Sequence, residues 1–91
     1  MTKKRILIVD DEHLIRWSLS QMLNDAGYEV ETAETGAKAL AKGRDYKPHL
    51  ILLDICLPDA NGMDLLPQFK DNNEDVVVVM ITAHSHADSA V

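Results

Sequence analysis

In Ile6-Leu7-Ile8-Val9-Asp10-Asp11 an apolar run stops abruptly at two adjacent carboxylates. A second apolar run, residues 50–53, ends in the same way at Asp54. If both runs are parallel strands of one sheet, their carboxyl ends emerge at the same edge, where open α/β sheets build ligand sites. We therefore expect Asp10, Asp11 and Asp54 to share one site.

Three carboxylates in one site need a positive charge between them. Like charges at close range repel unless a cation joins them, and carboxylate oxygens suit a hard divalent ion such as Mg²⁺. Because Mg²⁺ keeps several waters and takes only one or two carboxylates directly, at least one of the three acids should act through water or a hydrogen bond. The structural alternative is that Asp11 caps a helix and Asp54 begins a loop.

The composition is that of one small globular domain. Hydrophobic residues make up 46% of the 91 and charged residues 26%, so we expect a single domain over residues 1–91. No apolar run is long enough to span a membrane, and the lone Cys56 has no disulfide partner, which fits a reducing, cytoplasmic location. The net charge of -6 argues against contact between this segment and the phosphates of a nucleic acid.

Apolar runs alternate with stretches of helical period along the chain, a pattern typical of an α/β fold. We expect strands at about residues 5–9, 28–33, 50–53 and 76–81. The second alternates apolar and polar residues, which indicates a strand solvated on one face at a sheet edge. The last two are apolar without alternation, which predicts burial.

Three helices and the start of a fourth are expected between and after these strands. The second has Thr35 as its N-cap and ends at Lys47-Pro48, because the residue before proline disfavours the helical conformation. The third begins near Asp64, with Pro67 in its first turn, and ends at Asn72-Asn73. The expected apolar faces consist of Leu14, Ile15, Leu19, Met22, Leu23 and Ala26 in the first helix, which Gly27 closes, and of Ala37, Leu40 and Ala41 in the second.

Three motifs together resemble a response-regulator receiver domain of two-component systems. They are the acid doublet after the first strand, Asp54 followed by the loop of residues 57–62, and Thr82-Ala83 after the fourth strand. The resemblance implies a flavodoxin-like, doubly wound parallel sheet. Residues 80–85 look like receivers of the nitrogen-regulation type, which often precede an ATPase acting on sigma-54 RNA polymerase and a DNA-binding domain.

The resemblance also implies roles for the site residues. Asp54 would accept a phosphoryl group from a sensor histidine kinase, and Asp10, Asp11 and Asp54 would hold Mg²⁺ together with the backbone carbonyl of Cys56. The Cys56 side chain itself is expected to be a small buried hydrophobe. Thr82 would hydrogen-bond the phosphoryl group, although by itself it also fits a residue that ends a strand or caps a helix. Such a chain is a regulatory phosphoacceptor that controls a transcriptional output domain, and not a turnover enzyme.

Two other classes of protein fit the sequence less well. A Mg²⁺-dependent phosphohydrolase with an aspartyl nucleophile usually places its nucleophile and general acid two residues apart after one strand, unlike the adjacent Asp10-Asp11 pair and the remote Asp54. A flavin-binding module of the same topology needs a phosphate loop rich in Ser, Thr and Gly after the first strand. The acids at residues 10–12 would repel a phosphate there.

The sequence departs from the family in one respect. Receivers carry a lysine at the end of a fifth strand and an aromatic residue on that strand, and no lysine follows Thr82 here. We therefore expect a receiver truncated before the fifth strand, with four strands in the order 2-1-3-4. Its fourth strand would be an apolar edge, so we expect self-association through that strand or through exchanged elements. Phosphorylation by a small phosphodonor should be slow or absent, while Mg²⁺ should still bind.

Overall fold

Strands and helices alternate strictly along the chain. The computed structural model describes residues 3–81, and among them no helix is both long and apolar enough to cross a membrane. The elements in chain order are β1 (Arg5–Val9), α1 (His13–Asp25), β2 (Glu29–Ala33), α2 (Gly36–Tyr46), β3 (Leu50–Asp54), α3 (Gly62–Asn72) and β4 (Val77–Ile81).

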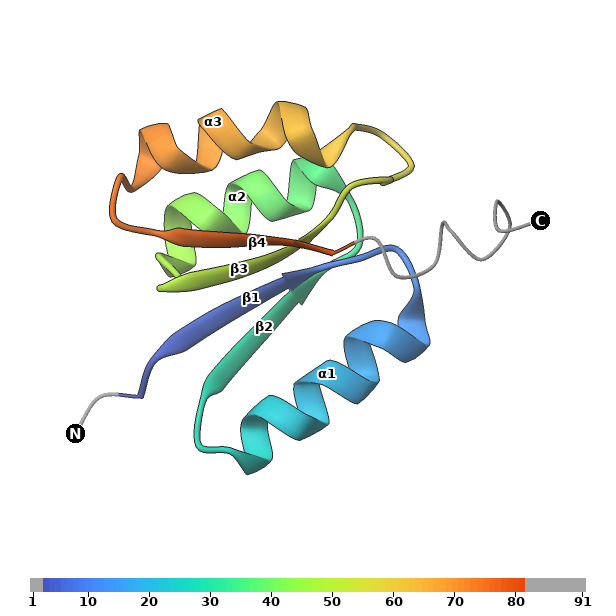
Figure 1. The fold of residues 1–91 in the computed structure, drawn as a ribbon, viewed down its shortest axis with the longest axis vertical. Helices are drawn as coiled ribbons and strands as arrows, with labels where there is room; N and C mark the ends of the chain where they lie inside the picture. Colours follow the sequence, from blue (N-terminus) through green and yellow to red (C-terminus); the bar gives the residue numbers. More distant parts are fainter. Residues whose placement is uncertain (1–2, 82–91) are drawn as a thin grey trace.

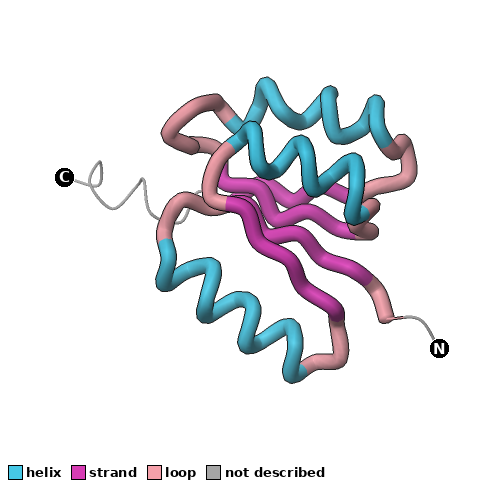
Figure 2. The backbone as a smooth tube through the Cα atoms, turned by 180° about the vertical axis from the view of Figure 1, so that it is seen from behind, coloured by secondary structure: helices cyan, strands magenta, loops and turns pink. Residues whose placement is uncertain are grey.

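The four strands form one parallel sheet in the order β2-β1-β3-β4, which confirms the predicted order and the flavodoxin-like fold class. Figure 1 shows α2 and α3 together on one face of the sheet and α1 on the other. The view from behind in Figure 2 shows the same three layers. We call these the two-helix face and the one-helix face. The central position of β3 explains its unbroken apolar sequence, because a central strand is covered from both sides.

The larger buried cluster lies on the two-helix face, while Ile6 and Ile8 of β1, which alternate with its members Leu7 and Val9, are buried outside it. Phe69 of α3 packs over Gly43 of α2, where a Cβ atom would lie 2.9 Å from Cδ1 of the Phe69 ring. The two helices can therefore approach closely only because residue 43 has no side chain. The residues of this core are Leu7, Val9, Ala33, Ala39, Ile51, Leu53, Leu65, Phe69 and Val76.

The ends of α1 and α2 follow the expected signals. Gly27 has φ 99°, and the N–H groups of Gly27 and Tyr28 donate to the carbonyls of Asn24 and Leu23, which is the Schellman arrangement. Thr35 accepts a hydrogen bond from the backbone N–H of Lys38 at 3.2 Å, as an N-cap does. Lys47 ends α2 in the left-handed conformation, just before Pro48.

The predicted start of the third helix is wrong. Asn61 accepts a hydrogen bond from the backbone N–H of Met63 at 2.8 Å, so Asn61 is the N-cap and α3 begins at Gly62. Pro67 consequently lies beyond the first turn, where its missing N–H leaves out one helical hydrogen bond. The helix ends at Asn72 with Asn73 as its cap, as expected.

Burial of the apolar residues was only partly predicted. None of the residues of α1 is fully buried, and Leu14 and Met22 are 71% and 64% exposed, because α1 is the one described helix on its face and leaves a flank in solvent. In α2 the buried side is Gly36, Ala39 and Gly43, turned toward α3, whereas Ala37 is exposed. β4 is the outer strand of the described sheet, as the predicted strand order implies, so the burial expected from its unbroken apolar sequence is wrong.

Candidate metal centre

The carboxyl ends of β1 and β3 meet at one edge of the sheet. Val9 is paired with Leu53 in the parallel register, so the residues that follow them, Asp10 and Asp54, emerge side by side. One carboxylate oxygen from each of Asp10, Asp11 and Asp54 lies within 4.8 Å of the others. The structure thus brings together the three acids that the sequence analysis assigned to one site.

Two of these three side chains are buried. Asp10 and Asp54 are each 1% exposed, whereas Asp11 lies at the surface. A buried carboxylate needs hydrogen bonds or a cation to offset its lost hydration. The backbone N–H of Glu12 donates to Oδ1 of Asp10 at 2.8 Å, and that of Cys56 donates to Oδ1 of Asp54 at 3.2 Å. Each buried acid is therefore oriented by the N–H two residues further along the chain.

The backbone around the buried acids is fixed by longer-range contacts. The N–H of Asp10 donates to the carbonyl of Ala33 at the end of β2, and the Arg16 side chain donates to the carbonyl of Asp10 at 2.8 Å. Gly62 lies so close to the end of β3 that a Cβ atom there would be 2.4 Å from the carbonyl oxygen of Asp54. Residue 62 therefore has to be glycine for the loop after Asp54 to fold back on the strand.

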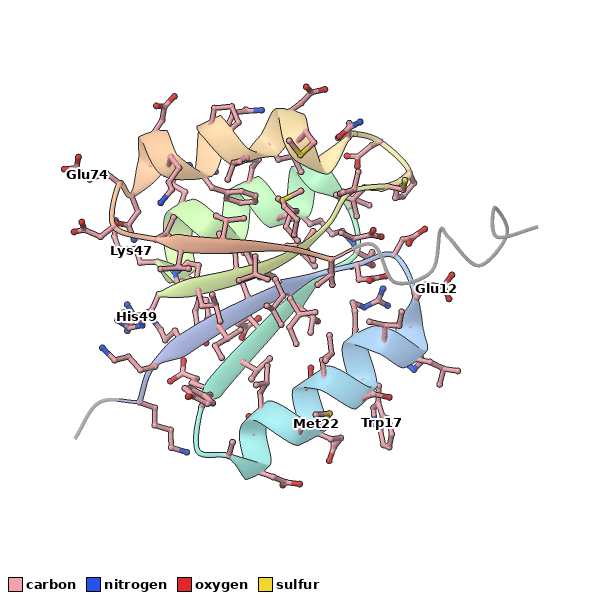
Figure 3. The ribbon with its side chains drawn as sticks, in the orientation of Figure 1. Glu12, Trp17, Met22, Lys47, His49 and Glu74 are labelled. Carbon is pink, nitrogen blue, oxygen red and sulfur yellow. The ribbon has the colours of Figure 1, made fainter. Side chains whose placement is uncertain are left out.

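The donor set fits a hard divalent cation. Three carboxylates within 4.8 Å offer only oxygen ligands, with no imidazole or thiolate in the group, which suits Mg²⁺ or Ca²⁺ better than zinc. Mutual repulsion of three anions at this distance also favours a cation between them. Figure 3 shows Glu12 at this edge of the sheet. Lys47, His49 and Glu74 lie at the opposite end of the strands, away from the cluster of acids.

Two further residues, Cys56 and Thr82, were predicted to belong to the site. The Cys56 side chain is exposed, which corrects the expectation of a small buried hydrophobe, because Cys56 forms an isolated bridge with Asn61 in the loop beyond the sheet. That its backbone carbonyl binds the metal stays a prediction. Thr82 lies outside the described residues, so its role stays a prediction as well.

Asp59, in the loop between β3 and α3, has a contact that the sequence does not predict. Its two carboxylate oxygens accept hydrogen bonds from the backbone N–H groups of Gly36, at 2.7 Å, and Ala37, at 3.1 Å, in the first turn of α2. An acid that follows proline in a loop is a weak signal, because nothing local in the sequence indicates a partner 23 residues away. The contact depends on the packing of α2 beside the loop.

A family model and several known proteins match this chain in sequence. A family model described as "Response regulator receiver domain" matches residues 6–91. The DNA-binding transcriptional regulator NtrC of Escherichia coli K12 is 37% identical over all 91 residues, and the chain spans only 19% of that longer protein. Sporulation initiation phosphotransferase F of Bacillus subtilis is 35% identical over 88 residues, which are 97% of this chain and 71% of that protein.

Solved structures share both fold and sequence with the chain. A CheY-like receiver domain protein from Methanospirillum hungatei has a TM-score of 0.88 at 38% identity, with 98% of this chain and 71% of that one covered. TrrA of Thermotoga maritima, crystallised in complex with Mg(2+)-BeF, has a TM-score of 0.83 at 39% identity over 97% of this chain and 76% of that one. A structure of the histidine kinase ThkA in complex with TrrA matches with a TM-score of 0.81 at 40% identity over 91% of this chain and 72% of that chain. With the four-stranded fold, the cluster of acids and a family match across nearly its whole length, this chain belongs to the response regulator receiver domain family.

Proposed function

We propose that the chain is a phosphorylation-dependent signalling module in which Asp54 accepts a phosphoryl group from a histidine kinase, in a reaction that depends on Mg²⁺. The observation that carries this proposal is the meeting of three carboxylates within 4.8 Å at the carboxyl edge of the sheet. Membership of the receiver family supports it, because receiver domains are regulatory phosphoacceptors.

The chemistry of phosphoryl transfer explains the cluster of acids. An Oδ atom of Asp54 forms a bond to phosphorus while the bond from phosphorus to the kinase imidazole breaks, and the imidazole nitrogen keeps the electron pair. The attacking carboxylate approaches a group that is itself negatively charged, so the site must offset the repulsion. When bound, a divalent cation supplies that positive charge. Asp10 and Asp11 would hold it, and the N–H of Cys56 orients the Asp54 carboxylate by donating to Oδ1.

Further assignments belong to the same proposal. The Cys56 carbonyl is a metal ligand, and the Thr82 hydroxyl donates a hydrogen bond to the transferred phosphoryl group. All 91 residues form one receiver unit, in keeping with the family match over residues 6–91. The module acts in the cytoplasm, where its single thiol stays reduced.

A sensor histidine kinase is the proposed donor, as the complex of ThkA with TrrA suggests for a similar receiver. The proposed receivers of the signal are an ATPase and a DNA-binding domain, because NtrC, a much longer protein, is a transcriptional regulator. The added negative charge on Asp54 would shift the domain between two arrangements that these partners distinguish.

Self-association through β4 is also part of the proposal. Val77 and Val79 of this outer strand are 56% and 43% exposed, and an apolar outer strand offers its backbone groups to another chain. Sedimentation equilibrium at tens of micromolar would show a dimer, and substituting Val79 with Lys would reduce it. A chain that is monomeric at these concentrations contradicts the proposal.

The central test is phosphorylation with acetyl phosphate and Mg²⁺, followed by measurement of the intact mass. On long incubation the wild-type chain should gain one phosphoryl group, slowly, as expected above for a small phosphodonor, and the Asp54→Asn variant should gain none. Asp45→Asn is the matched control, since it removes the same charge from an exposed position on α2. Without Mg²⁺ the gain should disappear.

Two outcomes would contradict the proposed function. A mass gain that persists in Asp54→Asn would place the phosphoryl group on another residue. Rapid, repeated hydrolysis of phosphate esters, with no stable gain of mass, would instead support a Mg²⁺-dependent phosphohydrolase with an aspartyl nucleophile.

A further inference from the structure

Asp59 connects the loop after Asp54 with the first turn of α2. It lies in the loop after Asp54, and its carboxylate accepts hydrogen bonds from the N–H groups of Gly36 and Ala37 at the start of α2. The loop and the helix touch closely here, because a Cβ atom at Gly36 would lie 3.0 Å from Cβ of Ala60 and 3.2 Å from Oδ1 of Asp59. The contact joins segments more than twenty residues apart.

The loop that Asp59 anchors is the one that orients Asp54. Within it, the N–H of Leu57 donates to the carbonyl of Ala60, and Cys56 forms a bridge with Asn61, so the loop folds back on itself as one unit. The N–H of Gly62 donates to the carbonyl of Ile55 at 2.6 Å and closes its base. Fixing the tip at Asp59 therefore fixes Cys56, whose N–H donates to the Asp54 carboxylate.

The start of α2, to which Asp59 is bonded, is also close in the chain to a residue that contacts Asp10. The helix α2 follows β2 after only two residues, and the last residue of β2, Ala33, accepts a hydrogen bond from the N–H of Asp10 at 3.1 Å. The Asp59 carboxylate thus connects the segment that orients Asp54 with the segment that fixes the backbone of Asp10. We call this connection the Asp59 clamp.

We propose that Asp59 is a positioning residue for the metal and phosphoacceptor site, holding the Cys56 backbone and the Asp54 carboxylate in place through the first turn of α2. This inference rests on the proposed function of the site. Removing a group that hydrogen-bonds a metal ligand directly typically lowers metal affinity by about 10- to 100-fold, and because Asp59 acts one step further out we expect the lower end of that range.

The test compares two variants that each take one cap from the same helix. Asp59→Ala removes both the clamp and a cap of α2. Thr35→Ala removes only a cap, the hydroxyl that accepts a hydrogen bond from the Lys38 N–H. We expect Asp59→Ala to weaken Mg²⁺ binding about tenfold by isothermal titration calorimetry. It should also speed hydrogen exchange at the Cys56 amide in the metal-free chain. Thr35→Ala should leave both at their wild-type values while lowering the melting temperature.

Asp59→Asn provides a graded check, because its side-chain amide retains one acceptor oxygen and can keep the bond to Gly36 but not both bonds. Its Mg²⁺ affinity and Cys56 exchange rate should lie between those of wild type and Asp59→Ala. Equal changes in Asp59→Ala and Thr35→Ala would overturn the proposal, as would an unchanged Asp59→Ala. A wild-type chain that binds no Mg²⁺ would instead contradict the proposed function, while the exchange rate of the Cys56 amide still decides whether Asp59 clamps the loop.

Discussion

On the two-helix face Leu65 and Phe69 are almost completely buried, whereas on the one-helix face Leu14 and Met22 of α1 are mostly exposed. The same contrast runs through the strands. Val78 and Met80 of β4 point into the two-helix core, while the alternate residues Val77 and Val79 are exposed. One sheet therefore has a face closed by two helices and a face that is only partly covered in the described residues. The larger buried cluster therefore lies on the closed face, although Ile6 and Ile8 of β1 are buried outside it.

The largest expected effect comes from removing the central side chain of the closed face. Phe69→Ala should lower the free energy of unfolding by about 3–5 kcal/mol, because it empties a buried position between α2, α3 and the sheet. Met22→Ala, its counterpart on the partly covered face, should change it by less than about 0.5 kcal/mol. Urea unfolding followed by circular dichroism measures both. Similar losses in the two variants would mean that the faces contribute equally.

Mg²⁺ binding at the carboxyl edge of the sheet should stabilise the folded chain. If Mg²⁺ binds only the folded chain, raising it from zero to one hundred times its dissociation constant should increase the free energy of unfolding by about 2.7 kcal/mol. The Asp54→Asn variant should gain less, since one of the three acids is neutral. EDTA should reverse the gain in the wild-type chain. An equal gain in both proteins would show that Mg²⁺ binds elsewhere.

Substitutions at two glycines distinguish steric crowding on the closed face from backbone strain at the end of α1. Gly43→Ala should cost roughly 1 kcal/mol net, because overpacking against the Phe69 ring outweighs the better helix propensity of alanine. Gly27→Ala should cost about 1–2 kcal/mol through its φ of 99° alone, since nothing lies within 4 Å of the added Cβ. Combining each change with Phe69→Leu in a double-mutant cycle separates the two causes: the larger cavity should relieve the cost at Gly43 and leave that at Gly27 unchanged.

The smallest expected effect is a pH dependence at Asp59. The N–H of Gly36, followed by that of Ala37, holds the pKa of Asp59 below its usual range. A carboxyl whose pKa is lower in the folded than in the unfolded state adds stability above its unfolded pKa, about 3.9, and loses it as the pH falls through the folded value. The stability difference between wild type and Asp59→Asn should therefore be full at neutral pH and shrink below about pH 4. Chemical unfolding of both proteins from pH 7 to pH 3 measures it; a constant difference contradicts the assignment.

The strands and the convergence of the acids could be predicted from the sequence because both are local signals. An apolar run that ends in a carboxylate defines the end of a strand, and parallel pairing brings two such ends together. The start of α3 was misplaced because Asn61 and Gly62 are typical of loops as well as of helix caps. The shift moved Pro67 out of the first turn.

Burial and distant contacts were harder to predict, because they depend on what packs against an element. Helical periodicity identifies the apolar residues of α1 but not whether another element covers them, so the exposure of Leu14 and Met22 was missed. Cys56 lies outside the sheet for the same kind of reason. Asp59 bonds to the start of α2, a partner that only the folded arrangement brings within reach.

Pro67 interrupts the hydrogen bonding of α3 and divides the helix into two short segments. It has no N–H, so the carbonyl of Met63 receives no helical hydrogen bond from residue 67. The segment before it adjoins the loop after Asp54 and contributes Leu65 to the core, and the segment after it contributes Phe69. We expect the first segment to open by local unfolding at a lower free energy than the second, so that a rearrangement around Asp54 is absorbed within one turn of helix while the remainder stays folded as a separate cooperative unit.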